Sequence, residues 1–235
     1  MTSAFVLAPE TTIAVIGAGR LGTVLAGALR AAGFDVRGPL GRTDEAPETD
    51  LAILAVPDGA IADAAATANS TKTAHLSGAT ALDAVDFSIH PLQTFTGTEP
   101  PEVFHGIGAA VDGRTDDDTQ LARDLARALG MTPFTVDGRA TYHAAASFAS
   151  NFVLTVLDTA EQLATAAGVE NPRETLAPLV RQTVDNWQRG GANAALTGPI
   201  ARGDEATVAR QREAADDKAL FDALATATRA LKDRA

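Results

Sequence analysis

The stretch TTIAVIGAGRLG, from Thr11 to Gly22, decides the fold class of this chain. Its first six residues, Thr11–Ile16, form a continuous β-branched and apolar run, which is typical of a buried strand. The next six, GAGRLG at 17–22, have the spacing G-x-G-x-x-G and lead into helical periodicity over 20–32. A strand, a glycine-rich turn and a helix in this order predict the first unit of a nucleotide-binding α/β domain.

Each glycine of this motif has a separate expected role. Gly17 permits the tight turn, Gly19 lets the backbone approach a pyrophosphate, and Gly22 lets the helix pack closely on the strand. The N-terminus of the helix then offers free N–H groups and the positive end of its dipole to the phosphates. The motif predicts dinucleotide binding. The alternative is a glycine-rich turn between strand and helix that binds nothing.

The alternation of strand and helix continues through the first half of the chain. Further strands are predicted at 34–37, 51–56, 73–76, 87–89, 107–111 and 132–136, and helices at 61–68 and 116–129. This order predicts βαβ units in a doubly wound, largely parallel sheet of the Rossmann type. After residue 139 only helices are predicted, at 142–167, at 173–188 and, as one or two, at 205–230. We therefore expect a dinucleotide-binding domain at 8–138 and an all-α domain at 139–235.

The composition excludes several classes of function. The chain has 235 residues, no cysteine, and 19 basic against 30 acidic residues, which gives a net charge of −11. This balance, without a basic patch, argues against binding to nucleic acid or to an anionic membrane. The lack of cysteine excludes a disulfide framework, thiolate catalysis and a cysteine metal site, and it accords with a cytoplasmic location. The four histidines show no zinc-like spacing, so no metal site is predicted.

Two segments bear on membrane association. Residues 1–10 have no basic region ahead of an apolar run and do not predict a signal peptide. Residues 140–157 carry no charged side chain over about 18 residues, which is near the lower limit of a membrane span. They include His143 and Asn151, however, and such polar groups are costly in lipid. The sequence therefore favours a buried core helix.

The end of the second predicted strand bears on the choice between NAD and NADP. A site for NAD usually presents an acidic residue about 20 positions after the glycine motif, where it binds the ribose 2′-hydroxyl. Here the stretch from Arg37 to Thr43 holds two arginines and no carboxylate before Asp44. Arg42 with Thr43 could hold a 2′-phosphate, because a guanidinium forks onto phosphate oxygens. The sequence favours NADP, the alternative being that these arginines are solvated loop residues.

Further motifs follow the glycine turn along the chain: AVPD at 55–58, HLSG at 75–78, HPLQTF at 90–95, YHAAASFASN at 142–151 and LTGPIARGD at 196–204. Together they resemble the Rossmann-like proteins whose C-terminal domain is named DUF2520, over nearly the whole chain. That family lies near the 6-phosphogluconate dehydrogenase-like, pyrroline-carboxylate reductase and ketopantoate reductase groups. The resemblance implies an NADP-dependent oxidoreductase that reduces a small oxo or imino acid, with a ketopantoate reductase-like activity as its most specific form.

One position departs from the family's pattern. After Asp204 the family often has Thr-Val-x-x-His, whereas here Thr207 and Val208 are followed by Gln211 in place of the histidine. This departure, and the lack of a lysine acid, keep an alternative open: a catalytically inactive NADP-binding sensor or scaffold protein.

Three polar residues, Asp58, Ser77 and His90, each follow a predicted strand, so they are expected to line one cleft. Alternatives are a helix N-cap for Asp58, a turn for Ser77, and a hydrogen-bonded structural histidine for His90. The residues assigned to the cofactor are Gly17, Gly19, Arg20, Leu21, Gly22, Arg42, Thr43, Val56, Pro57, Asp58 and Ser77.

The predicted long helix carries a polar stripe. His143, Ser147, Ser150 and Asn151 are spaced to share one helix face. In β-hydroxyacid dehydrogenases a comparable helix presents Lys-x-x-x-Asn, which would fall here on Ser147 and Asn151, so the lysine acid is absent. His143 is the best substitute, because histidine titrates near neutral pH. The alternative is a hydrogen-bond network at a dimer seam.

The remaining assignments complete the expected site. The predicted catalytic residues are His143, His90, Asn151 and Ser147, and the predicted substrate-binding residues are Gln93 and Arg202. Arg202 could clamp a carboxylate or could form a surface ion pair, and Asp204 is expected to cap the helix after it. Because the stretch 142–167 is too apolar for three shorter helices to cover, a homodimer is expected. The helical domain would then serve substrate binding and dimerisation.

Overall fold

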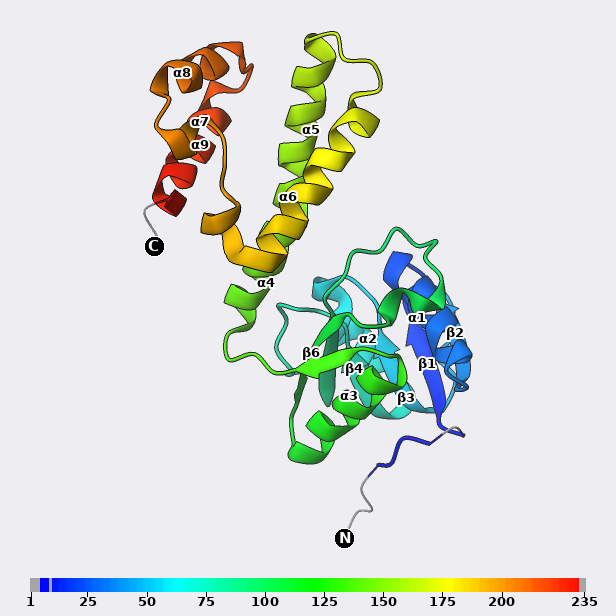
Figure 1. Cartoon of the computed structure of the whole chain (residues 1–235). Coiled ribbons are helices and arrows are strands. Elements are labelled where there is room, and N and C mark those ends of the chain that lie inside the picture. Colours follow the sequence, from blue (N-terminus) through cyan, green and yellow to red (C-terminus); the bar gives the residue numbers. More distant parts are fainter. Residues whose placement is uncertain (1–4, 9, 233–235) are drawn as a thin grey trace. The chain divides into compact units, whose positions relative to one another are not determined.

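The computed structural model describes residues 5–8 and 10–232 (Figure 1). The chain divides into two compact units, Met1–Asn151 and Phe152–Ala235. The first holds every described strand, and the second is built from helices.

A seven-stranded sheet forms the centre of the first unit. Its strands are β1 Thr12–Ile16, β2 Asp35–Leu40, β3 Thr49–Leu54, β4 Ser70–His75, β5 Phe87–Pro91, β6 Gly108–Gly113 and β7 Thr132–Phe134, in the order β2-β1-β3-β4-β5-β6-β7. All neighbouring pairs are parallel except β5 and β6. The predicted doubly wound, largely parallel sheet is confirmed, with the last two strands reversed relative to the first five. The carboxyl ends of β1, β3, β4 and β5 therefore meet at one edge.

The helices of this unit are α1 Arg20–Ala31, α2 Ile61–Thr67, α3 Asp116–Ala128 and α4 Arg139–Ala149, with short 3-10 turns η1 Asp58–Ala60 and η2 Pro101–Phe104. The core is continuous and apolar. Ile13 and Val15 of β1 are fully buried, as are Leu29 of α1 and Phe87 of β5. Because β1 is covered on both faces, its sequence is a run of apolar residues and does not alternate with polar ones.

The second unit contains α5 Asn151–Ala166, α6 Pro172–Ala195, α7 Pro199–Arg202, α8 Glu205–Ala214 and α9 Lys218–Lys232, with α5 starting at the last residue of the first unit. The described chain has no strand after β7, which confirms the prediction of helices alone. The described helices also include none with the length and apolar character needed to cross a membrane.

The single long helix predicted at 142–167 is wrong, because the structure breaks it into α4 and α5. Ser150 leaves the helical conformation, with φ −129° and ψ −73°. Its hydroxyl oxygen lies 2.8 Å from the carbonyl oxygen of Ala146 and 2.9 Å from Asn151 Oδ1. Such local bonds compete with the helical ladder. The four polar positions from His143 to Asn151 therefore do not share one face of a continuous helix.

The expectation of a buried core helix is also wrong for the chain by itself. Phe148 is 69% exposed, Leu154 on α5 65%, and Leu179 and Trp187 on α6 66% and 58%. The physical reason is the small number of covering residues in the second unit. Its buried apolar residues, among those that the structure describes, are Val208, Ala215 and Ala225.

Candidate functional site

The glycine turn between β1 and α1 has the close contacts that its motif predicts. Gly17 has a φ of +119°, and a Cβ there would lie 2.2 Å from the carbonyl oxygen of Ala55. A Cβ on Gly22 would lie 1.9 Å from the carbonyl oxygen of Gly17. Around Gly19, by contrast, no atom lies within 4 Å of an added Cβ. The first and third glycines thus let backbones approach each other, and the second faces open space.

The N-terminus of α1 is open in the same place. Its N-cap is Gly19, which has no side chain to accept a hydrogen bond, and the first turn carries no acidic residue. Arg20 and Leu21 begin the helix directly after the turn. The unpaired N–H groups and the positive end of the helix dipole are therefore available to an anion at this point.

The loop that follows β5 runs beside this turn. A Cβ on Gly97 would lie 3.4 Å from the Cα of Arg20. The Glu99 carboxylate accepts hydrogen bonds from the backbone N–H groups of Thr96 at 2.6 Å and Gly97 at 2.9 Å. The hydroxyl and backbone N–H of Thr96, as its main hydrogen-bond donors, lower the pKa of Glu99 to about 2. The loop also carries the exposed Gln93, one of the two predicted substrate residues.

The two arginines at the end of β2 and on the turn after it have different surroundings. Arg37 forms an ion pair of 2.9 Å with Asp35. Asp44 closes the following turn, its Oδ2 accepting the N–H of Gly41 at 2.7 Å. Arg42 and Thr43 lie exposed on this turn, and Arg42 makes no hydrogen bond or ion pair with any described residue.

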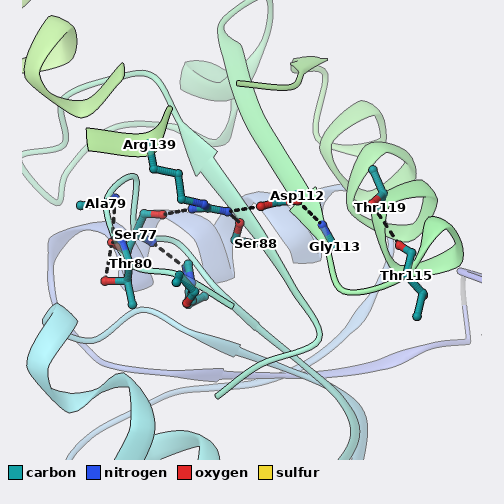
Figure 2. Close-up of polar contacts among 11 residues, drawn as sticks. Ser77, Ala79, Thr80, Ser88, Asp112, Gly113, Thr115, Thr119 and Arg139 are labelled. Carbon is teal, nitrogen blue, oxygen red and sulfur yellow. Dashed lines mark hydrogen bonds and ion pairs between the residues drawn. The ribbon is translucent and has the colours of Figure 1, made fainter. Parts of the chain in front are cut away.

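Asp58 and Ser77 come together beyond β3 and β4. The Ser77 hydroxyl donates to Asp58 Oδ2 at 2.9 Å. Ser77 Oγ also accepts the N–H groups of Ala79 and Thr80 at 3.1 and 3.0 Å (Figure 2). Ser77 therefore has the turn role that was one of its alternatives. The N-cap alternative for Asp58 is wrong, because α2 begins after Ala60 and the Asp58 carboxylate takes a hydroxyl from another loop.

Two further cofactor assignments lie between these groups. Val56 and Pro57 follow β3 after Ala55, and Val56 Cγ1 would lie 3.3 Å from a Cβ on Gly17. The side chain of Val56 is half-buried and Pro57 is exposed. This segment therefore connects the glycine turn with the Asp58–Ser77 pair along the edge of the sheet.

His90, near the end of β5, is surrounded by aromatic side chains of α4. Its Nδ1 lies 2.7 Å from the hydroxyl oxygen of Tyr142. The ring centroids of Tyr142 and His143 lie 5.4 and 6.0 Å from that of His90, both in edge-on geometry. Burial first, and then the neighbouring His143 and Arg139, lower the pKa of His90 to about 4. The imidazole is therefore uncharged at neutral pH.

Arg139 ties the first turn of α4 to the sheet. Its Nη1 donates to the carbonyl oxygen of Ser77 at 3.4 Å, and its Nη2 donates to Ser88 Oγ and pairs with Asp112 Oδ2 at 3.1 Å (Figure 2). The guanidinium thus joins the loop after β4 to β5 and β6. Sequence reasoning missed Arg139 and Tyr142. Arg139 had only its position as a signal, at the start of the helix that follows the last strand, whereas Tyr142 stands in the motif YHAAASFASN at 142–151.

The other predicted residues are more dispersed. His143 is exposed, and the Ser147 hydroxyl donates to its backbone carbonyl oxygen at 3.2 Å. Arg202 lies exposed at the end of α7 in the second unit, and its proposed ion pair is not formed with any described residue. Asp204 caps α8 as predicted, accepting the N–H of Thr207 at 3.1 Å. In the described parts of the chain, no three histidine or acidic side chains gather as metal ligands would.

The family described as "Domain of unknown function (DUF2520)" matches residues 107–228, which is more than half of the chain. This chain belongs to the DUF2520 family. No protein in a search of curated sequences matches it.

Solved structures show that the DUF2520 protein has a widely shared fold. A Bacteroides fragilis protein named as a candidate NADP oxidoreductase is 24% identical, with a TM-score of 0.81 over 96% of this chain and 99% of its own. A Thermotoga maritima protein is 21% identical, with a TM-score of 0.72 over 94% and 98%. The 1-pyrroline-5-carboxylate reductase of Streptococcus pyogenes is 12% identical, with a TM-score of 0.61 over 96% and 100%. At these identities the likeness establishes the fold.

Proposed function

We propose that this DUF2520 protein is an NADP-dependent oxidoreductase that reduces a small oxo or imino acid. The observation that carries the proposal is the glycine turn, where Gly17 and Gly22 are locked by backbone contacts while Gly19 faces open space at an uncapped helix. This is the arrangement that a pyrophosphate needs. Similarity in fold to proteins named as an NADP oxidoreductase and a pyrroline-carboxylate reductase supports it.

The order of the strands indicates how a dinucleotide would lie. With its pyrophosphate at the glycine turn, one half extends towards β2 and the other over the ends of β3, β4 and β5. The first half would meet Arg42 and Thr43, and the second Asp58, Ser77 and His90. When bound, the reduced nicotinamide supplies a hydride. The residues that would hold the cofactor are Gly17, Gly19, Arg20, Leu21, Gly22, Arg42, Thr43, Val56, Pro57, Asp58 and Ser77.

The preference for NADP over NAD rests on Arg42. It is exposed beside the end of β2 and unpaired within the described chain, so its guanidinium is free to fork onto a 2′-phosphate. Asp44, the nearby carboxylate, is engaged with the N–H of Gly41. Because Arg42 pairs with no described residue, its charge is available to an anionic ligand.

Substrate chemistry is proposed near the carboxyl end of β5, where His90 meets Tyr142 and His143 of α4. We call this region the histidine end of the sheet. His90 and His143 are the titratable residues of the predicted catalytic set, and their rings are in contact there. Ser147 and Asn151 continue along the same segment. Gln93 and Arg202 are proposed to bind the substrate, whose most specific candidate is ketopantoate. We propose that the two units divide this work, with the cofactor held by the Rossmann-like part and the helical part serving substrate binding and dimerisation.

A homodimer is proposed through the faces of α5 and α6. An ion pair of 2.9 Å between Glu161 and Arg173 links these helices, and an apolar groove of about 490 Å³ lies along them. Leu154 and Leu179, 65% and 66% exposed, stand on the two helices. Apolar surface of this kind is what a second copy would cover.

The dimer has a direct test. Light scattering at micromolar concentration should give twice the monomer mass. Leu179→Asp should weaken dimerisation at least tenfold, since a buried interface anchor contributes about 2 kcal/mol. The matched control is Gln188→Asp, a change at an exposed polar position of the same helix, which should leave the dimer intact. A wild-type monomer that retains its helix content would contradict the proposal.

A cytoplasmic location is proposed from the lack of cysteine.

The reductase function is tested by two alanine substitutions in one segment. Gly19→Ala adds a methyl group in the space reserved for the pyrophosphate, so NADPH binding should weaken at least tenfold with no loss of stability. Gly27→Ala adds the same methyl group to open space within α1, and it should bind NADPH normally. The measurements are titration by nucleotide fluorescence and thermal unfolding. Equal NADPH binding by both variants would refute the site.

A second candidate function is favoured by Gln211, which stands where the family often has a histidine. A cofactor-binding sensor or scaffold would bind NADPH without turning over. Loss of NADPH absorbance with a panel of oxo and imino acids separates the two functions. Oxidation with any of them supports the reductase, whereas tight NADPH binding with no oxidation across the panel supports the sensor.

A further inference from the structure

Tyr142 is the only tyrosine of the chain, and its hydroxyl is held in a defined place. The oxygen lies 2.7 Å from His90 Nδ1. Phe134 packs edge-on against the Tyr142 ring, with centroids 5.8 Å apart. On the histidine side the imidazole packs tightly on Gly78, where a Cβ would lie 3.0 Å from three atoms of the ring. The phenol and the imidazole therefore form a positioned pair.

The pair sits where the proposed reaction needs a proton. His90 is near the carboxyl end of β5, beside the end of β4, where the nicotinamide half of a dinucleotide would lie. Arg139 fixes the first turn of α4 to Ser88 and Asp112, and Tyr142 follows three residues later. Both partners are thus anchored to the sheet and not to a free loop.

The surroundings keep both groups uncharged at neutral pH. Burial raises the pKa of Tyr142 to about 12, against the opposing influence of the Arg139 charge. Burial also lowers the pKa of His90 to about 4. A phenol in such a site releases its proton only if the resulting oxyanion is neutralised at once. The Nδ1 of His90 is at hydrogen-bond distance to do this.

We propose that Tyr142 is the proton donor of the reduction and that His90 is its proton relay, an assignment that rests on the function proposed above. Hydride from a reduced nicotinamide, the donor in the proposed function, would add to the carbon of the substrate C=O or C=N bond, and the π electron pair would move to the oxygen or nitrogen. The Tyr142 O–H bond breaks, and its proton bonds to that heteroatom. The phenolate oxygen takes the Nδ1 proton of His90, while Nε2 takes a proton from water. One hydride and one proton are consumed in each turnover.

Tyr142 fits this role better than its neighbour His143. The His143 side chain is exposed, and its ring makes no hydrogen bond with a described residue. Its ring centroid is 6.0 Å from that of His90. A general acid acts efficiently when it is held at a defined position. The hydrogen bond with His90 fixes the Tyr142 oxygen, and when Nδ1 carries the proton it leaves the phenol proton free for the substrate.

The test compares Tyr142→Phe, which removes only the hydroxyl, with His143→Ala and Phe134→Leu. Tyr142→Phe should lower the rate of substrate reduction about 10²-fold or more, with NADPH affinity and thermal stability unchanged. Phe134→Leu, which leaves the Tyr142 hydroxyl in place, should stay within about tenfold of the wild type, and His143→Ala tests the competing assignment. A readout that needs no substrate is ¹⁵N NMR of the four imidazoles. The His90 signal, identified by its loss in His90→Gln, should titrate with a midpoint near pH 4, and it should move in Tyr142→Phe.

The outcomes separate this assignment from the proposed function. If the wild type reduces a substrate and Tyr142→Phe keeps the wild-type rate, Tyr142 is not the donor, and the reductase function stands. A large loss in His143→Ala with none in Tyr142→Phe moves the role to His143. A wild type that binds NADPH but reduces no oxo or imino acid overturns the assignment and the reductase function together.

Discussion

The glycine turn after β1 and the histidine end of β5 lie at the same edge of one sheet, yet they are built in opposite ways. The turn is made by six consecutive residues whose contacts are between backbones. The histidine end joins groups that are far apart in sequence: Tyr142 lies 52 positions after His90, and Arg139 lies 62 positions after Ser77. A site that depends on glycines in one short stretch can be predicted from the sequence. A site that depends on contacts between distant side chains forms only when the whole domain has folded.

The largest expected effect comes from filling the turn. Gly22→Ala places a Cβ 1.9 Å from the carbonyl oxygen of Gly17, so α1 must move away from β1. We expect a loss of about 3 kcal/mol or more in the free energy of unfolding. Gly27→Ala, in the same helix and in open space, should raise stability by up to about 1 kcal/mol. Urea unfolding of both variants measures the contrast, and similar values for the two would show that the turn is not tightly packed.

The histidine end should instead respond to pH. Burial lowers the pKa of both His75 and His90, for His90 to about 4. Between pH 6.5 and 4 the unfolded chain binds more protons than the folded one, so stability is complete above this window and falls as pH is lowered through it. His90 alone contributes at most about 3 kcal/mol. Urea midpoints across the window should fall with pH, and His90→Asn should flatten the dependence. If the urea midpoint of His90→Asn changes with pH as much as that of the wild type, a group other than His90 causes the dependence.

Arg139 should matter to the histidine end alone. Its side chain is 19% exposed and bonds to Ser88 and Asp112. Arg139→Ala should lower the free energy of unfolding by about 2 kcal/mol, because charged hydrogen bonds are lost. It should also alter the NMR signal of His90 by freeing α4, while NADPH binding at the glycine turn persists. NADPH affinity that falls as much as stability would mean that the two ends are not independent.

The smallest expected effect concerns Arg42, which lies at the outer edge of the turn region. Arg42→Ala should weaken NADPH binding about tenfold and leave NADH binding unchanged, since only a 2′-phosphate would lose a partner. The exposure of the guanidinium keeps the effect small. Arg37→Ala is the matched control, because Arg37 already pairs with Asp35. If Arg42→Ala loses as much affinity for NADH as for NADPH, Arg42 attracts both nucleotides by its charge and does not bind the 2′-phosphate.

Strands and helices of the first unit were predictable because their signals are local. The apolar run at Thr12–Ile16 and the period of Arg20–Ala31 each follow from nearest neighbours in the chain. The break at Ser150 was not predictable in this way. Its neighbours favour a helix, and the bond from its hydroxyl to the carbonyl oxygen of Ala146 has the same spacing as bonds made by Ser147 and Thr159 inside unbroken helices.

The sequence by itself determined the glycine turn and the Rossmann-like sheet, and it also indicated the cap at Asp204. In each case the physical cause lies within a few residues, as a missing side chain, an apolar period or a carboxylate at a helix start. Only the tertiary structure decided that Asp58 bonds Ser77, that Arg139 joins the loop after β4 to β5 and β6, and that Tyr142 meets His90. A polar side chain has many possible partners along a chain, and burial selects one of them when distant elements pack together.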